Sequence, residues 1–142
     1  MTEREAIIEI VNKLYIYTDF RQWDQLQDEV FAPEVFLDMT SMGGKAEDTT
    51  PAAICAMWEE GFKGLDAVNH LAGNYLVKLT TDGEAEAFAY ATATHYKASA
   101  TRGKTREFVG TYDFKLKRLD HGWRIYHFVY ELKYASGNMD LA

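Results

Sequence analysis

The side chains best suited to acid–base chemistry in this sequence are those of Asp19, His70 and His95. At 100° per residue, Asp19 lies about 20° around the first predicted helix from Ile8, and Tyr15 lies about 20° on the other side. The carboxylate is therefore expected within the buried stripe of the helix, where an unpaired charge is costly. Two interpretations stay open: a structural Asp that binds an Arg or backbone amides, or an acid–base group in a cavity, with its pKa set by a partner.

His70 is the natural partner to test, because it shares a strand face with Val68 and Ala72. His95 falls on the next predicted strand, on one face with a run of alanines at positions 89, 91 and 93. Small side chains leave room either for a closely packed helix or for a ligand. A single strand histidine is more often structural than catalytic, but two of them near a buried Asp make catalysis an equal alternative.

Aromatic side chains alternate along the two last predicted strands and are typical of a core. Two features indicate a cavity instead: Gly110 leaves a gap, and buried tyrosine hydroxyls need hydrogen-bond partners. The residues expected to line a substrate pocket are Tyr15, Trp23, Met39, Trp58, Phe108, Tyr112, Phe128 and Tyr130.

A metal site is the rival interpretation, because Asp19, His70 and His95 could form a two-His-one-carboxylate face for non-haem iron. No His-x-Asp pair supports this site. The sequence also lacks a Gly-rich phosphate loop, a Gly-x-Ser-x-Gly motif and a His-Glu-x-x-His motif. We therefore expect neither a metal nor a cofactor.

The 142 residues carry a formal charge of −7, which disfavours nucleic acids and anionic membranes as partners. The local basic cluster of Arg102, Lys104 and Arg106 lies beside Gly103 and is interpreted as a solvated hairpin turn rather than a phosphate site. Cys55 is the single cysteine, so no internal disulfide can form. With no signal-peptide pattern and no long apolar run, a cytoplasmic location is expected.

The hydrophobic periodicity predicts one α+β domain over residues 1–142, with helices on one face of a mostly antiparallel sheet. Hairpin signals at Asp82-Gly83 and His121-Gly122 separate the later strands, and Gly103 falls in a third turn. Predicted helices cover residues 4–20, 23–31 and 51–62, a short strand covers 34–39, and long strands cover 68–79, 84–99, 105–120 and 122–134.

Four segments resemble SnoaL-like proteins of the nuclear-transport-factor-2-like superfamily: Tyr17–Trp23, Phe31–Asp38, Asn69-His70, and Gly110-Thr111-Tyr112 with Gly122-Trp123-Arg124-Ile125. The resemblance covers nearly the whole chain. It implies a cone-shaped α+β barrel of three N-terminal helices packed on a curved, mostly antiparallel sheet. It also implies a ligand pocket between the helices and the sheet.

Within that group the pattern is most similar to scytalone dehydratase and lindane dehydrochlorinase, in which a helix Asp orients a proton-abstracting strand His. The resemblance implies these roles for Asp19 and His70, and it implies a second pocket histidine at His95. The substrate-specific positions differ, since Met39 and Gly110 stand where that dehydratase has a tyrosine and a serine. Proton-transfer chemistry is therefore implied, whereas scytalone as the substrate is not.

Together these observations predict a cofactor-independent lyase or isomerase that acts on a small, apolar, cyclic or aromatic molecule. The alternative is a SnoaL-like domain that binds a small molecule without turnover, or that serves as an assembly subunit. By analogy with similar folds, a homodimer formed through the outer face of the sheet is also expected.

Overall fold

The computed structural model describes residues 1–142, in which three helices pack against one six-stranded sheet. The helices are α1 (Glu3–Asp19), α2 (Trp23–Glu29) and α3 (Pro51–Gly61), with a 3-10 turn η1 at Thr40–Met42. The strands are β1 (Phe31–Asp38), β2 (Ala46–Thr49), β3 (Ala67–Leu79), β4 (Glu84–Tyr96), β5 (Thr105–Leu119) and β6 (Gly122–Gly137).

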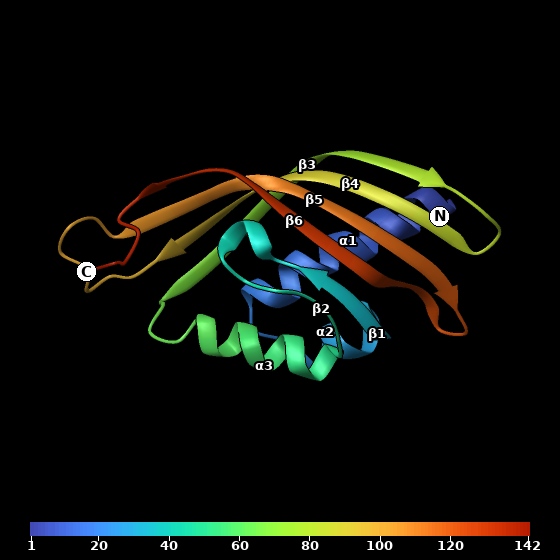
Figure 1. Ribbon diagram of the computed structural model, residues 1–142, viewed down its shortest axis with the longest axis horizontal. Coiled ribbons are helices and arrows are strands. Elements are labelled where there is room, and N and C mark those ends of the chain that lie inside the picture. Colours follow the sequence, from blue (N-terminus) through green and yellow to red (C-terminus); the bar gives the residue numbers. More distant parts are fainter.

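The sheet is curved but open, with β2 and β3 as its two edges in the order β2-β1-β6-β5-β4-β3. Neighbouring strands are antiparallel except β1 and β6, which run parallel. The long strands arch over the helices in Figure 1. Register shifts interrupt three of the strand pairs: β1 with β6 between Phe31 and Phe36, β3 with β4 between Gly73 and Leu76, and β5 with β6 at two places, after Val109 and after Lys115. Such irregularities bend strands and increase their twist, which suits a sheet of this curvature.

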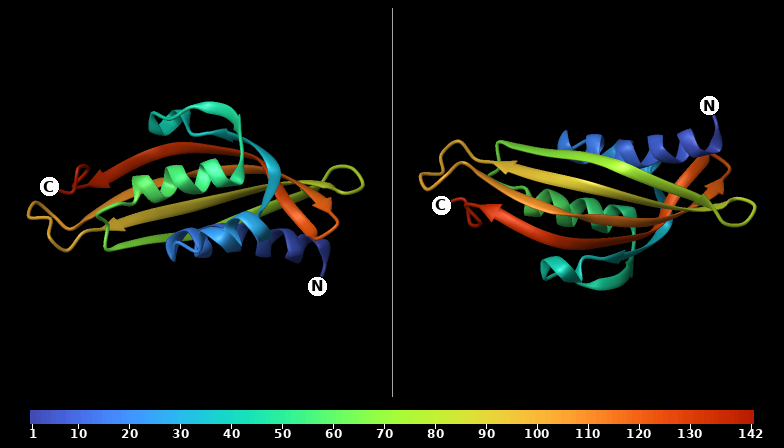
Figure 2. Two further views of the ribbon diagram at one scale, coloured as in Figure 1. Left: turned by 90° about the horizontal axis from the view of Figure 1, so that it is seen from below. Right: turned by 90° about the horizontal axis from the view of Figure 1, so that it is seen from above.

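All three helices lie on the concave side of the sheet, as the views from below and above show (Figure 2). Thr2 caps the N-terminus of α1, because its hydroxyl accepts a hydrogen bond from the Glu5 amide at 3.1 Å. Thr50 caps α3 in the same way, with Pro51 in the first turn of the helix. None of the helices has both the length and the apolar character that a membrane span requires.

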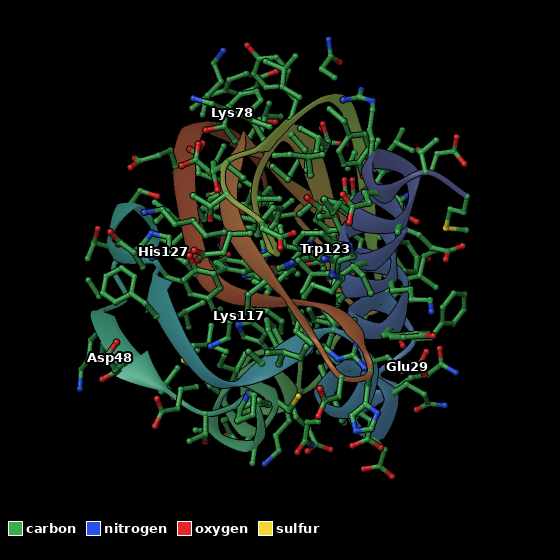
Figure 3. The ribbon with its side chains drawn as sticks, turned by 90° about the vertical axis from the view of Figure 1, so that its right-hand side faces the viewer. Glu29, Asp48, Lys78, Lys117, Trp123 and His127 are labelled. Carbon is green, nitrogen blue, oxygen red and sulfur yellow. The ribbon has the colours of Figure 1, made fainter.

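The main core lies between the concave face of the sheet and the helices, and its largest fully buried side chains are Phe114 and Phe128. Trp123, at the start of β6, belongs to this core and lies on the side of α1 in Figure 3. Asp48 on the short edge strand β2 lies on the opposite side of the molecule (Figure 3). The predicted α+β fold, with helices on one face of a curved sheet, is confirmed.

Several predicted boundaries were wrong, including the ends of β4 and β6, which the structure places at Tyr96 and Gly137 instead of 99 and 134. The second helix ends at Glu29 instead of 31, and β1 begins at Phe31, before Pro33, instead of at 34. Pro33 is tolerated because it falls where the register between β1 and β6 is interrupted, and so no ladder hydrogen bond needs its missing N–H. The strand β2 was not predicted, since it has only four residues, two of them are acidic, and most are exposed.

Candidate active site

Asp19 and His70 are in direct contact at the junction of α1 and β3. Asp19 is the last residue of α1, and its Oδ1 lies 2.6 Å from Nδ1 of His70. Its Oδ2 accepts a hydrogen bond from the backbone N–H of His70 at 2.8 Å. Both side chains are only 11% exposed. Both carboxylate oxygens of Asp19 are therefore hydrogen-bonded to His70, one to its backbone and one to its ring, which fixes the position of the imidazole.

This contact determines which imidazole nitrogen of His70 is free. A carboxylate can only accept a hydrogen bond, so Nδ1 carries a proton, and in the neutral imidazole Nε2 keeps its lone pair. The ring of Tyr15 stacks on the imidazole at a centroid distance of 5.7 Å and holds its plane. A neutral imidazole in this tautomer can accept a proton through Nε2, while Asp19 stabilises the imidazolium that results.

The imidazole of His70 lies in the wall of a cavity of about 250 Å³ between the helices and the sheet. Eleven of the fifteen residues that line the cavity are hydrophobic. The lining residues are Leu14, Tyr15, Thr18, Met39, Met42, Trp58, Gly61, Phe62, His70, Ala93, His95, Phe108, Tyr112, Phe128 and Tyr130. No lysine, arginine, aspartate or glutamate is among them, so the cavity suits an uncharged, mainly apolar molecule.

Both predicted histidines and seven of the eight residues expected to line a pocket border this cavity. Asp19 does not line the cavity; it lies behind His70 and is bonded to the ring of that residue. Trp23 is the one residue of the eight that does not line the cavity. Its ring stacks at a centroid distance of 6.4 Å on that of Phe62, which does line it. Trp23 therefore supports the wall from behind.

The gap expected at Gly110 is filled by Tyr130. A Cβ at position 110 would lie 2.5 Å from both the Tyr130 hydroxyl and the Glu131 carbonyl oxygen. The glycine thus lets the phenol ring of Tyr130 lie across β5. The interpretation of Gly110 as a source of cavity space was wrong, since the space is taken by a neighbouring side chain.

Replacing Gly110 with alanine is expected to lower the free energy of unfolding by about 1–3 kcal/mol, the usual cost of overpacking. The added methyl group must displace backbone as well as the Tyr130 ring. Chemical denaturation of Gly110→Ala beside Gly73→Ala measures this effect. Gly73 is a matched strand glycine with no atom within 4 Å of an added Cβ, so equal stability of the two variants would contradict the predicted clash.

Three tyrosines form one wall of the cavity, with Tyr112 placed between Tyr15 and Tyr130 at centroid distances of 5.4 and 4.8 Å. Burial raises the pKa of all three phenols, that of Tyr130 to about 12. The hydroxyls of Tyr15 and Tyr130 are buried and have no hydrogen-bond partner in the protein. They are therefore neutral groups whose hydrogen-bonding capacity no protein group satisfies.

His95 faces the cavity two residues along β4 from Ala93, which pairs with His70. Its ring lies 5.6 Å from that of Phe62 and 5.3 Å from that of Phe108. The Nε of Arg106 donates a hydrogen bond to Nδ1 of His95 at 3.0 Å. The interpretation of Arg106 as part of a solvated turn was therefore wrong: it lies on β5, opposite His95, and is partly buried.

Burial, the positive charge of Arg106 and the neighbouring His70 lower the pKa of His95 from the ordinary 6.5 to about 4. The unfolded chain therefore binds a proton at this position more readily than the folded chain does. The resulting stabilisation is complete above pH 6.5 and is lost as the pH falls toward 4. Between these pH values, the wild type should lose more free energy of unfolding than His95→Gln, measured by urea denaturation at each pH. Parallel losses would contradict the lowered pKa.

Six cavity residues were not predicted to contact a ligand: Leu14, Thr18, Met42, Gly61, Phe62 and Ala93. Met42 belongs to the turn η1. The Ser41 hydroxyl holds this turn against β6, because it donates a hydrogen bond to the Tyr130 carbonyl oxygen and accepts one from the Leu132 N–H, both at 2.9 Å. Phe62 caps the end of α3. The sequence signal was limited to an apolar side chain next to a turn, which does not reveal the direction in which that side chain points.

No three His, Cys, Asp or Glu side chains are grouped closely enough to hold a metal ion. Asp19 and His70 bind each other, and Nδ1 of His95 is occupied by Arg106. The two-His-one-carboxylate iron site weighed from the sequence therefore lacks the required geometry. Burial raises the pKa of the Cys55 thiol to about 11, so this cysteine is a buried thiol and not an activated nucleophile.

Comparison with known proteins places these features in a family context. A model of the SnoaL-like domain matches residues 1–129. A search of curated protein sequences found no match. Among solved structures, the Kfla4162 protein of Kribbella flavida superposes with a TM-score of 0.89 at 21% identity, over 98% of this chain and 95% of that one.

Several of the similar structures are named for a reaction, among them a proposed aromatic ring hydroxylase, a dehydratase and dehydrochlorinases. A proposed scytalone dehydratase from Novosphingobium aromaticivorans has a TM-score of 0.81 at 14% identity, over 96% of this chain and 87% of that one. The hexachlorocyclohexane dehydrochlorinase LinA-type3 from Novosphingobium barchaimii has a TM-score of 0.79 at 12% identity, over 94% and 88% of the respective chains. At such low identity these similarities establish a shared fold.

Proposed function

The chain belongs to the SnoaL-like domain family, and from this premise we propose that it is a cofactor-independent lyase or isomerase. Its proposed substrate is a small, apolar, cyclic or aromatic molecule. The observation that carries the proposal is the contact of 2.6 Å between Asp19 and His70 in the wall of an apolar cavity. The names of the dehydratase and the dehydrochlorinase with the same fold are consistent with it.

In the proposed reaction, Nε2 of His70 removes a proton from a carbon atom next to a carbonyl or a leaving group. Asp19 keeps the proton of Nδ1 in place and stabilises the imidazolium. His95, with Tyr112 or Tyr130, donates a hydrogen bond to the oxygen that departs or gains charge. Positioned proton transfer of this kind contributes about 10²–10⁴-fold to a rate, and the electrostatics of the cavity supply further stabilisation.

The dehydration of 3-hydroxycyclohexanone to cyclohexenone tests the proposal with a molecule of suitable size and chemistry. The product absorbs in the ultraviolet, so turnover can be followed continuously. Release of cyclohexenone above the buffer rate, and its loss in His70→Ala, would support the assignment. Binding of the ketone with no turnover would instead favour the alternative, a SnoaL-like domain that binds a small molecule without reaction.

We also propose that the chain forms a homodimer through the outer face of the sheet. No helix covers this face in Figure 2. Large apolar side chains are exposed on β3, β4 and β6, including Leu71 and Leu76, which are 74% and 69% exposed. Analytical ultracentrifugation should give twice the chain mass for the wild type and the single-chain mass for Leu71→Asp. A monomeric wild type would contradict this proposal.

A further inference from the structure

His95 and Arg106 face each other across β4 and β5 at the end of the cavity. The guanidinium can only donate hydrogen bonds, so Nδ1 of His95, 3.0 Å from Arg106 Nε, must be the acceptor. A neutral imidazole that accepts through Nδ1 carries its proton on Nε2. His95 therefore has the opposite tautomer to His70, and its free nitrogen is a donor.

The guanidinium of Arg106 is itself fixed in place. Its Nη1 donates to the carbonyl oxygen of Met139 at 2.7 Å, and its charged carbon lies 5.8 Å from the centre of the Phe108 ring. Gly137 pairs with Arg106 on β6, and a Cβ there would lie 3.0 Å from the Arg106 Cα. Arg106 takes part in none of the five salt bridges of the chain, so a carboxylate does not neutralise its charge.

We propose that Arg106 is a positioning residue that holds His95 as a neutral Nε2–H donor, and that the substrate presents a carbonyl oxygen to this donor. This inference rests on the proposed function and narrows it, because it assigns carbonyl compounds as the substrate class. A saturated halogenated hydrocarbon has no oxygen to accept this hydrogen bond. The two histidines then act as a pair, with a proton acceptor at His70 and a hydrogen-bond donor at His95.

In the proposed step, a hydrogen bond from His95 stabilises the negative charge that develops on the carbonyl oxygen. Nε2 of His70 takes the proton from the carbon next to the carbonyl, and the C–H electron pair forms a carbon–carbon double bond. The π electrons of the carbonyl move onto its oxygen, which becomes an enolate oxygen held by Nε2–H of His95. The enolate then expels a group from the β-carbon with its bonding pair, and a departing hydroxide takes the proton from His70.

Arg106 supports this step without touching the substrate. Its positive charge lies directly behind the imidazole and polarises the Nε2–H bond toward the developing negative charge. The other groups around His95 are the uncharged rings of Phe62 and Phe108 and the imidazole of His70. No acidic side chain lines this cavity, so nothing there favours protonation of His95.

Nitrogen-15 NMR of the ligand-free wild type tests the tautomer directly. Nε2 of His95 should show a bonded proton and Nδ1 the shift of an unprotonated nitrogen, still at about pH 5. Arg106→Met should reduce the preference for this tautomer toward that of a free imidazole, whereas Arg106→Lys should retain more of it. The signals of His70 serve as the internal control. A proton on Nδ1 of His95, or an imidazolium at neutral pH, in the wild type would overturn the proposal.

The substrate class is tested with cyclohexanone and methylenecyclohexane, which have nearly the same shape and differ in the oxygen. The wild type should bind the ketone about fivefold more tightly than the alkene, the effect of one neutral hydrogen bond. The infrared carbonyl stretch of the bound ketone should move to lower frequency. His95→Phe and Arg106→Met should remove both effects. Equal binding of the two molecules, or of neither, by the wild type would overturn the proposal.

The failure of this inference is distinguishable from the failure of the proposed function. If the ketone preference depends on His95 but His70→Ala does not change turnover, the donor assignment stands and the proposed reaction fails. If His70 is essential for turnover but the ketone and the alkene bind equally, the reaction stands and the role of Arg106 is wrong.

Discussion

Replacing His70 with alanine should reduce the rate constant of the proposed dehydration by about 10²–10⁴-fold, the usual contribution of a positioned general base. Of the two histidines that line the cavity, only His70 has an unprotonated ring nitrogen that is free, since the unprotonated Nδ1 of His95 already accepts a hydrogen bond from Arg106. The fold should survive, because the backbone N–H of residue 70 still donates to Asp19. Steady-state kinetics with 3-hydroxycyclohexanone and a circular dichroism melt measure the two effects separately.

His127→Ala is the matched control, since His127 is a strand histidine on β6 that does not line the cavity. Its ring stacks on Phe36 at 4.9 Å. The turnover of this variant should equal that of the wild type. An equal loss of activity in both histidine variants would show that the effect comes from the sheet as a whole, and it would contradict a specific role for His70.

Asp19→Asn should be nearly as damaging as His70→Ala, with a loss that approaches the same range of about 10²–10⁴-fold, because Asp19 sets the tautomer of the proposed catalytic imidazole. Asp19 accepts two hydrogen bonds from His70, one from the ring and one from the backbone. An asparagine side chain has only one oxygen, so its NH₂ group must face Nδ1 or the backbone N–H. If it faces Nδ1, the proton moves to Nε2 and His70 can no longer act as a base.

Asp66→Asn is the control for this variant. Asp66 also accepts a backbone hydrogen bond, from the Ala98 amide at 2.7 Å, but it does not line the cavity. Its replacement should leave the rate constant unchanged. If Asp19→Asn keeps full activity with the same pH profile as the wild type, the orienting role assigned to Asp19 is wrong.

The contact between Asp19 and His70 could be predicted because it depends on local periodicity. Asp19 falls within the buried stripe of α1, and His70 shares a face of β3 with the buried Val68. The face on which each side chain lies can be predicted from the periodicity of a single helix or a single strand. Bringing the two elements together then requires only that the helix pack on the sheet.

The role of Arg106 was missed although the sequence carried a signal for it. Arg106 has the same parity as Phe108 and Tyr112 on β5, so strand alternation places it on the cavity face. The nearby Gly103 and Lys104 made the segment resemble a solvated turn. The interpretation of Arg106 used the composition of the neighbouring residues, whereas the direction of its side chain is set by its position in the alternation of β5.

Other features depended on contacts between distant segments. The parallel pairing of β1 with β6 joins residues that are far apart in the sequence, and no local pattern specifies such a partner. The occupation of the Gly110 gap by Tyr130 depends on the register shift between Val109 and Gly110. Sequence periodicity cannot locate a shift of this kind, and a shift of one residue changes the face on which a side chain lies.

The most direct test of the account follows the carbon-bound proton itself. Cyclohexanone carrying deuterium at the carbons next to its carbonyl is incubated in ordinary water with the wild type or His70→Ala, and the loss of deuterium is measured by mass spectrometry. The wild type should exchange deuterium for hydrogen well above the buffer rate, and His70→Ala should match buffer alone. Exchange at the buffer rate with the wild type, while binding of the ketone is demonstrated, would contradict proton abstraction by His70.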